Sequence, residues 1–154
     1  MVGPRKVPVI LEEIQIHNAD TGNGGFPKPM PRILVVDDEE SIRKLLSIAF
    51  LRAGHKVRTA ADAREALALC AAESFDVLLS DVLMPQVNGH DLVRWVTASH
   101  PTIRCVLMSA FDDTDCQDCP LRSRCHLLPK PFNPNDAVSL VERVLREPVL
   151  RTER

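Results

Sequence analysis

The sequence predicts an α/β fold in which a doubly wound, five-stranded parallel sheet is flanked by helices, the fourth of them atypical. Short, strongly apolar segments alternate along the chain with longer segments whose apolar residues recur every three or four positions. Two of the short segments end abruptly in carboxylates, at Asp37 and Asp38 and again at Asp81. The chain has 154 residues, 45% hydrophobic and 26% charged, which is the length and balance of one ordinary globular domain.

Five segments have the character of strands. The first is apolar on all sides, as expected of a parallel strand that is covered on both faces. The segments alternate with helical ones, which is the order of strand–helix–strand units in a parallel sheet. The predicted strands are Ile33–Val36, Lys56–Ala60, Phe75–Ser80, Arg104–Ser109 and His126–Leu128.

The helical segments each present one apolar face. The first has apolar residues at i, i+3, i+4, i+7 and i+8 from Ile42 to Phe50, and Gly54 is a natural stop after it. The last repeats this spacing from Ala137 to Leu145. Between these two we expect helices over Ala61–Ala72 and around Leu92–Val96.

Composition excludes several classes of protein. The net charge is −2, from 19 Lys and Arg against 21 Asp and Glu, so there is no electrostatic reason to expect bulk nucleic-acid binding. No apolar run approaches the roughly 18–20 residues of a membrane span. Met1–Ile10 is interrupted by Gly3, Pro4 and Pro8, unlike a signal peptide. We therefore expect a cytoplasmic protein whose five cysteines are thiols or metal ligands rather than disulfides.

Polar residues follow the carboxyl ends of four predicted strands. Asp37 and Asp38, then Asp81, Ser109 and finally Lys130 stand there. Because ligands of open parallel sheets bind beyond these ends, we expect the five side chains to share one crevice. Three carboxylates held together repel one another, and Mg²⁺ prefers oxygen ligands, so the pattern predicts a magnesium site. A carboxylate beside such a cation can accept a phosphoryl group.

Four motifs in order resemble the receiver domain of bacterial two-component response regulators: ILVVDDEE, LLSDVLMPQVNG, VLMSA and LPKPF. The resemblance covers about Arg32–Glu147 and implies the five-stranded receiver fold. It implies that Asp81 is the phosphoacceptor and that Asp37, Asp38, Asp81 and the backbone carbonyl of Leu83 hold Mg²⁺. Ser109 matches the hydroxyl position and Lys130 the lysine that pairs with the phosphoryl group, with a cis bond to Pro131. Pro85 and Gly89 match the loop after the acceptor.

The resemblance also implies an organisation and a set of partners. We expect a flexible extension over residues 1–31, a receiver domain over 32–147 and a tail over 148–154. We expect a single-domain regulator that is phosphorylated by a sensor histidine kinase or phosphotransfer protein and acts by contact with an unknown downstream protein. Direct DNA binding and membrane association are not expected, and a homodimer stays open. The chain would be no enzyme beyond its own phosphorylation and dephosphorylation.

Between Ser109 and Lys130 the sequence departs from the family. Pro120 should break the fourth helix. Cys116, Cys119 and Cys125 with His126 form C-x₂-C-x₅-C-H, which can bind Zn²⁺ or hold an iron–sulfur cluster, serve as a redox dithiol, or consist of reduced structural thiols. A metal- or redox-sensing module on a receiver scaffold is therefore the alternative function.

Three further expectations rest on individual residues. Leu127 replaces the aromatic residue that the family usually has three positions before the lysine. Cys70 and Cys105 lie on apolar stripes and are expected to pack in the core. A hydrolase of the phosphoaspartate type is a weaker third hypothesis, because Asp81 is followed by Val82 and Leu83 rather than by a second acid.

Overall fold

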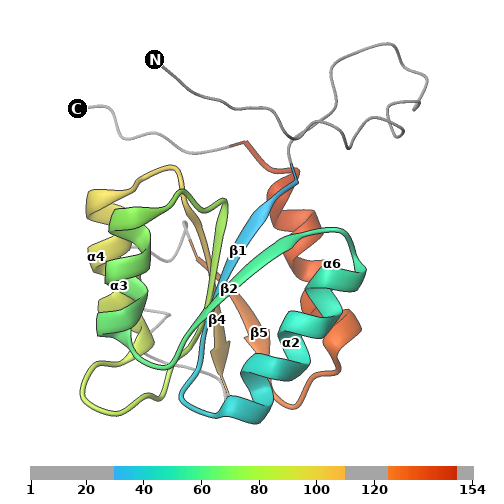
Figure 1. Cartoon of the computed structure of the whole chain (residues 1–154), viewed down its shortest axis with the longest axis horizontal. Helices are drawn as coiled ribbons and strands as arrows, with labels where there is room; N and C mark the ends of the chain where they lie inside the picture. Colours follow the sequence, from blue (N-terminus) through green and yellow to red (C-terminus); the bar gives the residue numbers. More distant parts are fainter. Residues whose placement is uncertain (1–29, 110–124, 149–154) are drawn as a thin grey trace.

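A computed structural model describes residues 30–109 and 125–148, which form one five-stranded sheet with helices on both faces (Figure 1). All strand pairings are parallel, and the order across the sheet is β2-β1-β3-β4-β5. The predicted fold class is confirmed. The atypical helix that was predicted in the segment after Ser109 lies outside the described residues. In chain order the elements are β1 (Arg32–Val36), α2 (Glu40–Arg52), β2 (Lys56–Ala60), α3 (Ala63–Ala72), β3 (Val77–Asp81), α4 (Gly89–Ser99), β4 (Arg104–Ser109), β5 (Cys125–Pro129) and α6 (Pro134–Leu145).

Two apolar layers cover the two faces of the sheet. Helices α3 and α4 pack on one face, and α2 and α6 on the other (Figure 1). The alternation of side chains along each strand divides the core, so that Leu34 belongs to the first layer and Ile33 to the second. The central strand β3 is buried along its whole length, which explains why Val77, Leu78 and Leu79 are apolar in succession without alternation.

Element ends differ from the predicted ones where a side chain or the strand ladder decides them. Helix α3 begins at Ala63 rather than Ala61, because the Asp62 side chain accepts the Glu65 N–H and caps the helix. Strand β3 continues to Asp81, which pairs with Met108 of β4. Gly54 has φ 94° after α2, the left-handed conformation predicted for a helix stop.

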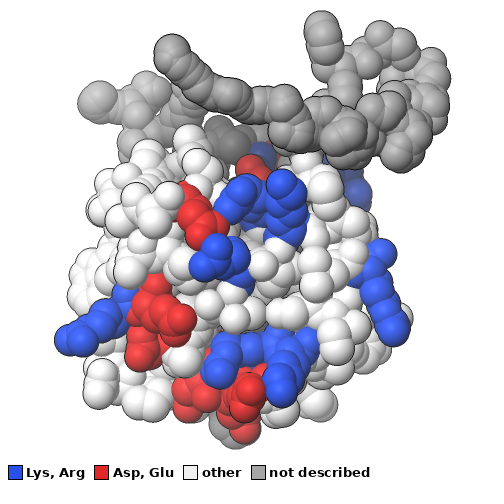
Figure 2. Space-filling view, viewed as in Figure 1, with Lys and Arg blue, Asp and Glu red and all other residues white. Residues whose placement is uncertain are grey.

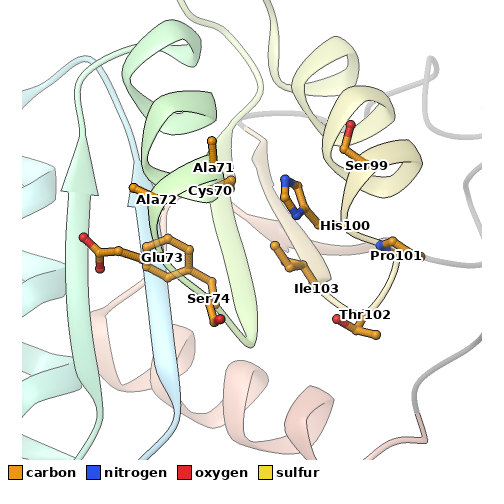
Figure 3. A pocket seen from close by; sticks show the side chains of 11 residues that line it. Cys70, Ala71, Ala72, Glu73, Ser74, Ser99, His100, Pro101, Thr102 and Ile103 are labelled. Atoms are coloured by element: carbon orange, nitrogen blue, oxygen red, sulfur yellow. The ribbon is translucent and has the colours of Figure 1, made fainter. Parts of the chain in front are cut away.

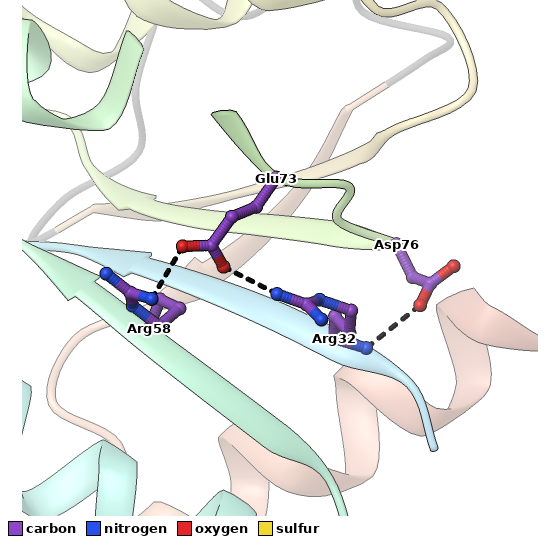
Figure 4. Close-up of polar contacts among 4 residues, drawn as sticks. All are labelled: Arg32, Arg58, Glu73 and Asp76. Carbon is purple, nitrogen blue, oxygen red and sulfur yellow. Dashed lines mark hydrogen bonds and ion pairs between the residues drawn. The ribbon is translucent and has the colours of Figure 1, made fainter. Parts of the chain in front are cut away.

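An ion-pair network closes the amino-terminal end of the sheet. Glu73, just after α3, accepts hydrogen bonds from Arg32 of β1 and Arg58 of β2, and the Asp76 carboxylate accepts from the Arg32 N–H (Figure 4). The Arg32 guanidinium also lies 5.7 Å from the centre of the Phe75 ring. These contacts join the start of β1, the middle of β2 and the segment that precedes β3. They lie away from the carboxyl ends of the strands.

A hollow of about 500 Å³ lies between the carboxyl-terminal ends of α3 and α4 (Figure 3). Its walls include Cys70, Phe75, His100 and Ile103, all near the starts of β3 and β4 rather than their ends. The hollow is therefore at the end of the sheet away from the predicted carboxylate crevice.

Charged side chains of both signs are interspersed on the face that Figure 2 shows, with no continuous basic patch there. Across 30–109 and 125–148, none of the helices combines the length and the apolar character needed to cross a membrane.

Candidate functional site

The carboxyl ends of β1 and β3 bring Asp37, Asp38 and Asp81 together. β1 and β3 are neighbours, and the chain leaves β1 toward β2 on one side and passes through β3, β4 and β5 on the other. This is the point where the winding of the sheet reverses, and open α/β sheets bind ligands there. One oxygen from each of the three carboxylates lies within 4.8 Å of the other two. The predicted cluster of acids is thus present in the fold.

Asp37 is the most constrained member of the cluster. Its side chain is fully buried, and Oδ1 accepts a hydrogen bond of 2.9 Å from the Glu39 N–H. Oδ2 is buried and has no hydrogen-bond partner among the residues the structure describes. Burial raises the pKa of Asp37 to about 6; the hydrogen bond from Glu39 and the charge of Lys130 lower it, and the charges of Asp81 and Asp38 raise it.

The donor set fits a hard divalent cation. An orphaned, buried carboxylate oxygen beside two further carboxylates is an unfavourable arrangement for the protein alone, because a buried acceptor without a partner carries a desolvation penalty. Mg²⁺ takes oxygen ligands in proteins. All three acids offer carboxylate oxygens, and two of the acids, Asp37 and Asp81, are buried. Asp38 is exposed, so this side of the cluster is open to solvent and to an incoming group.

Lys130 contacts the acidic cluster and is bonded through its backbone to Ser109. The Lys130 ammonium lies 3.1 Å from Asp81 Oδ1, and the Lys130 N–H donates to the carbonyl of Ser109 at 2.7 Å. Ser109 is buried at the end of β4. The bond between Lys130 and Pro131 is cis, as the family resemblance implies. One cation therefore lies beside the acid that was predicted as the acceptor, and Ser109 ends the strand that is adjacent to β3.

The loop after Asp81 returns closely to the site. The Gly89 N–H donates to the carbonyl of Val82 at 2.8 Å, and α4 begins at Gly89. Gln86 has φ 72°, a conformation that few residues other than glycine adopt, and the Val87 N–H donates to the carbonyl of Pro85 around it. Leu83 is 70% exposed at the rim, two positions after Asp81.

The structure separates two of the four residues of the predicted cysteine cluster. Cys125 packs against the layer under α3 and α4, whereas His126 Nε2 lies 3.1 Å from a carboxylate oxygen of Glu147, just beyond α6 on the other face. Neighbouring residues of a strand point to opposite faces, so one ion cannot be bound by both while β5 keeps its pairing. Cys116, Cys119 and Pro120 lie outside the described residues.

Other predicted residues are placed as follows. Cys70 and Cys105 are buried in the apolar layer under α3 and α4, as predicted, and burial raises the pKa of the Cys70 thiol. Leu127 is 41% exposed on the edge strand β5. One residue that the motifs did not single out also reaches the site: Arg43 of α2 donates to the backbone carbonyl of Asp37 at 2.7 Å.

Comparisons with known proteins give matches that cover most of the chain. The model of the response regulator receiver domain family matches residues 33–142. The chain is 38% identical over 114 residues to the DNA-binding transcriptional regulator NtrC of Salmonella typhimurium. The aligned region covers 73% of this chain and 24% of that protein. It is 31% identical over 113 residues to the response regulator protein FleR of Pseudomonas aeruginosa, with 73% and 24% covered. The chain thus spans about a quarter of the length of these curated relatives.

Two solved structures illustrate the likeness of fold. The chemotaxis response regulator CheY4 of Vibrio cholerae matches with a TM-score of 0.69 and 34% identity over 75% of this chain and 99% of that one. The response regulator TrrA of Thermotoga maritima, solved in complex with Mg²⁺ and BeF, matches with a TM-score of 0.68 and 27% identity, with 75% and 99% covered.

Proposed function

The chain belongs to the response regulator receiver domain family, and from this premise we propose that Asp81 accepts a phosphoryl group from a sensor histidine kinase or phosphotransfer protein. The observation that carries the proposal is the position of Asp81 between two further carboxylates and the Lys130 ammonium. We propose the receiver unit to span residues 32–147, with output through contact with another protein.

The residues of the chain divide the chemistry among them. A carboxylate oxygen of Asp81 forms a bond to phosphorus as the bond from phosphorus to the donor breaks, and the donor leaves with its electron pair. Lys130, already within 3.1 Å of Asp81, pairs with an oxygen of the arriving group, and Ser109 offers its hydroxyl to another. Asp37, Asp38, Asp81 and the Leu83 carbonyl are the proposed ligands of Mg²⁺, which when bound offsets negative charge on the phosphoryl oxygens.

Asp81→Asn is expected to abolish phosphoryl uptake, because an amide oxygen is a far weaker nucleophile than a carboxylate. The full chain is incubated with Mg²⁺ and a small acyl phosphate, and intact-protein mass spectrometry counts the phosphoryl groups. Wild type should gain one. Asp91→Asn is the matched control, since Asp91 pairs with Arg94 on the surface of α4 and should leave uptake unchanged. Labelling retained in Asp81→Asn would refute the assignment.

The phosphorylated chain is expected to lose its phosphoryl group slowly. Leu83 is exposed at the rim of the site and, being apolar, cannot hold an attacking water by a hydrogen bond. Following the phosphorylated fraction over time should give a lifetime of minutes or longer in wild type. Leu83→Asn should shorten it, because an amide can orient the water, and Leu83→Met should not. A lifetime of seconds in wild type would contradict this expectation.

A further inference from the structure

We infer that Arg43 is a positioning residue for the cation site: its guanidinium holds the main-chain carbonyl of Asp37 and thereby fixes the turn that presents Asp37 and Asp38. The inference rests on the proposed function, because it concerns the same carboxylates. It adds to the site a residue that lies outside the acidic motif, the strand ends and the loop after Asp81.

Asp37 has four polar groups, and three of them are tied to other parts of the chain. Its N–H donates to the Ala60 carbonyl at 3.2 Å, Oδ1 accepts from the Glu39 N–H at 2.9 Å, and its carbonyl accepts from Arg43 Nη1 at 2.7 Å. The fourth, Oδ2, is the buried oxygen without a partner among the described residues. The three bonds therefore determine where the remaining oxygen points, and the one from Arg43 is donated by a side chain.

The carbonyl that Arg43 holds belongs to the peptide group between Asp37 and Asp38. A rotation of that peptide would move both carboxylates at once, because it is the link between their α-carbons. Arg43 lies in the first turn of α2, where its own N–H donates to the Glu39 carbonyl at 3.2 Å. The side chain thus reaches back from the helix to the turn, and the start of α2 and the two acids form one unit.

The role follows from geometry rather than from charge. The side-chain charges that shift the pKa of the Asp37 carboxyl are those of Asp81, Lys130 and Asp38. Arg43 contacts the main chain instead, through a planar group whose several N–H donors have fixed directions. A lysine keeps the charge but ends in a single flexible ammonium, so it should not replace this contact.

The test measures Mg²⁺ binding to the full chain by titration calorimetry. Arg43→Ala and Arg43→Lys should each weaken binding about tenfold, the usual effect of losing a residue that orients a metal ligand. Arg52→Ala is the matched control, because it removes an arginine from the last turn of the same helix. In acyl-phosphate labelling, the Arg43 variants should need more Mg²⁺ for half-maximal rate and reach the wild-type rate at saturation, which a general loss of stability would not produce.

The outcomes distinguish failure of the role inferred for Arg43 from failure of the proposed function. An Arg43→Ala dissociation constant within about twofold of wild type would overturn the inference. So would wild-type binding by Arg43→Lys, since charge alone would then suffice. If Arg43→Ala does not fold, the lysine variant carries the test by itself. Wild type that neither binds Mg²⁺ nor takes up a phosphoryl group would instead overturn the proposed function.

Discussion

Asp37→Asn is expected to raise the free energy of unfolding of the metal-free protein by about 2 kcal/mol near neutral pH while removing Mg²⁺ binding. The Asp37 side chain is fully buried and its Oδ2 has no partner within the described part of the chain. Burial, Asp81 and Asp38 all raise its pKa, which reaches about 6 against an ordinary value of 3.8. An amide of the same shape removes the buried charge.

The sign of the effect depends on pH. Between about pH 4 and pH 6 the folded wild type holds a proton on Asp37 that the unfolded chain has released. The free energy of unfolding of wild type therefore falls as the pH rises through this window, and the penalty is complete above it. The advantage of Asp37→Asn should be present at about pH 7.5 and nearly vanish at about pH 4.

Urea unfolding with and without Mg²⁺ measures both halves of this prediction. Saturating Mg²⁺ should stabilise wild type, because only the folded state offers the three carboxylates together, and leave Asp37→Asn unchanged. Glu40→Gln is the control, since Glu40 is an exposed acid in the first turn of α2 and should shift the midpoint little. If Asp37→Asn is less stable than wild type without metal, the buried charge of Asp37 does not destabilise the folded state and the prediction is wrong.

The order of strands and helices could be predicted from the sequence because burial on both faces imposes continuous apolar runs. The ends of β2 and β4 could also be predicted, whereas those of β3 could not. Phe75 is buried and apolar but precedes β3, and Asp81 is acidic but belongs to it, because the ladder to β4 rather than the character of the side chain decides where a strand ends. A hydrogen-bonding ladder is a property of the neighbouring strand, which local sequence does not contain.

The proximity of the three acids and Lys130 could be predicted because parallel strands end at one edge of the sheet. The role of Arg43 could not be predicted, because an arginine on a half-exposed helix face is commonplace. Its hydrogen bond to the Asp37 carbonyl depends on the conformation of the turn between β1 and α2. The opposite orientation of Cys125 and His126 could not be predicted, because the predicted strand began at His126 and left Cys125 outside it. The structure begins β5 at Cys125, so the two adjacent side chains point to opposite faces of the sheet.

Gly89→Ala is expected to lower the free energy of unfolding by about 3 kcal/mol and the melting temperature by roughly 10 °C. A methyl group at Gly89 would lie 2.4 Å from the backbone carbonyl oxygen of Asp81, 2.9 Å from Leu107 Cδ2 and 3.0 Å from the Val82 α-carbon. Two of these three atoms belong to the backbone, so α4 and the end of β3 must separate for the alanine to fit.

The separation would fall on the phosphoacceptor itself. The Gly89 N–H donates to the carbonyl of Val82, the residue after Asp81, and this bond anchors the start of α4 to the end of β3. Moving the anchor displaces the Asp81 carboxylate from Lys130, so acyl-phosphate labelling of Gly89→Ala should be slower than that of wild type even at temperatures where the variant is folded.

Gly54→Ala separates this clash from the ordinary effect of replacing a glycine. Gly54 has φ 94°, and a methyl group there would have no atom within 4 Å. Its replacement should cost about 1 kcal/mol through backbone strain alone and leave the labelling rate at the wild-type value. Thermal unfolding and labelling of both variants make the comparison. If Gly89→Ala loses no more stability than Gly54→Ala and is labelled as fast as wild type, the close approach of α4 to Asp81 has no functional consequence.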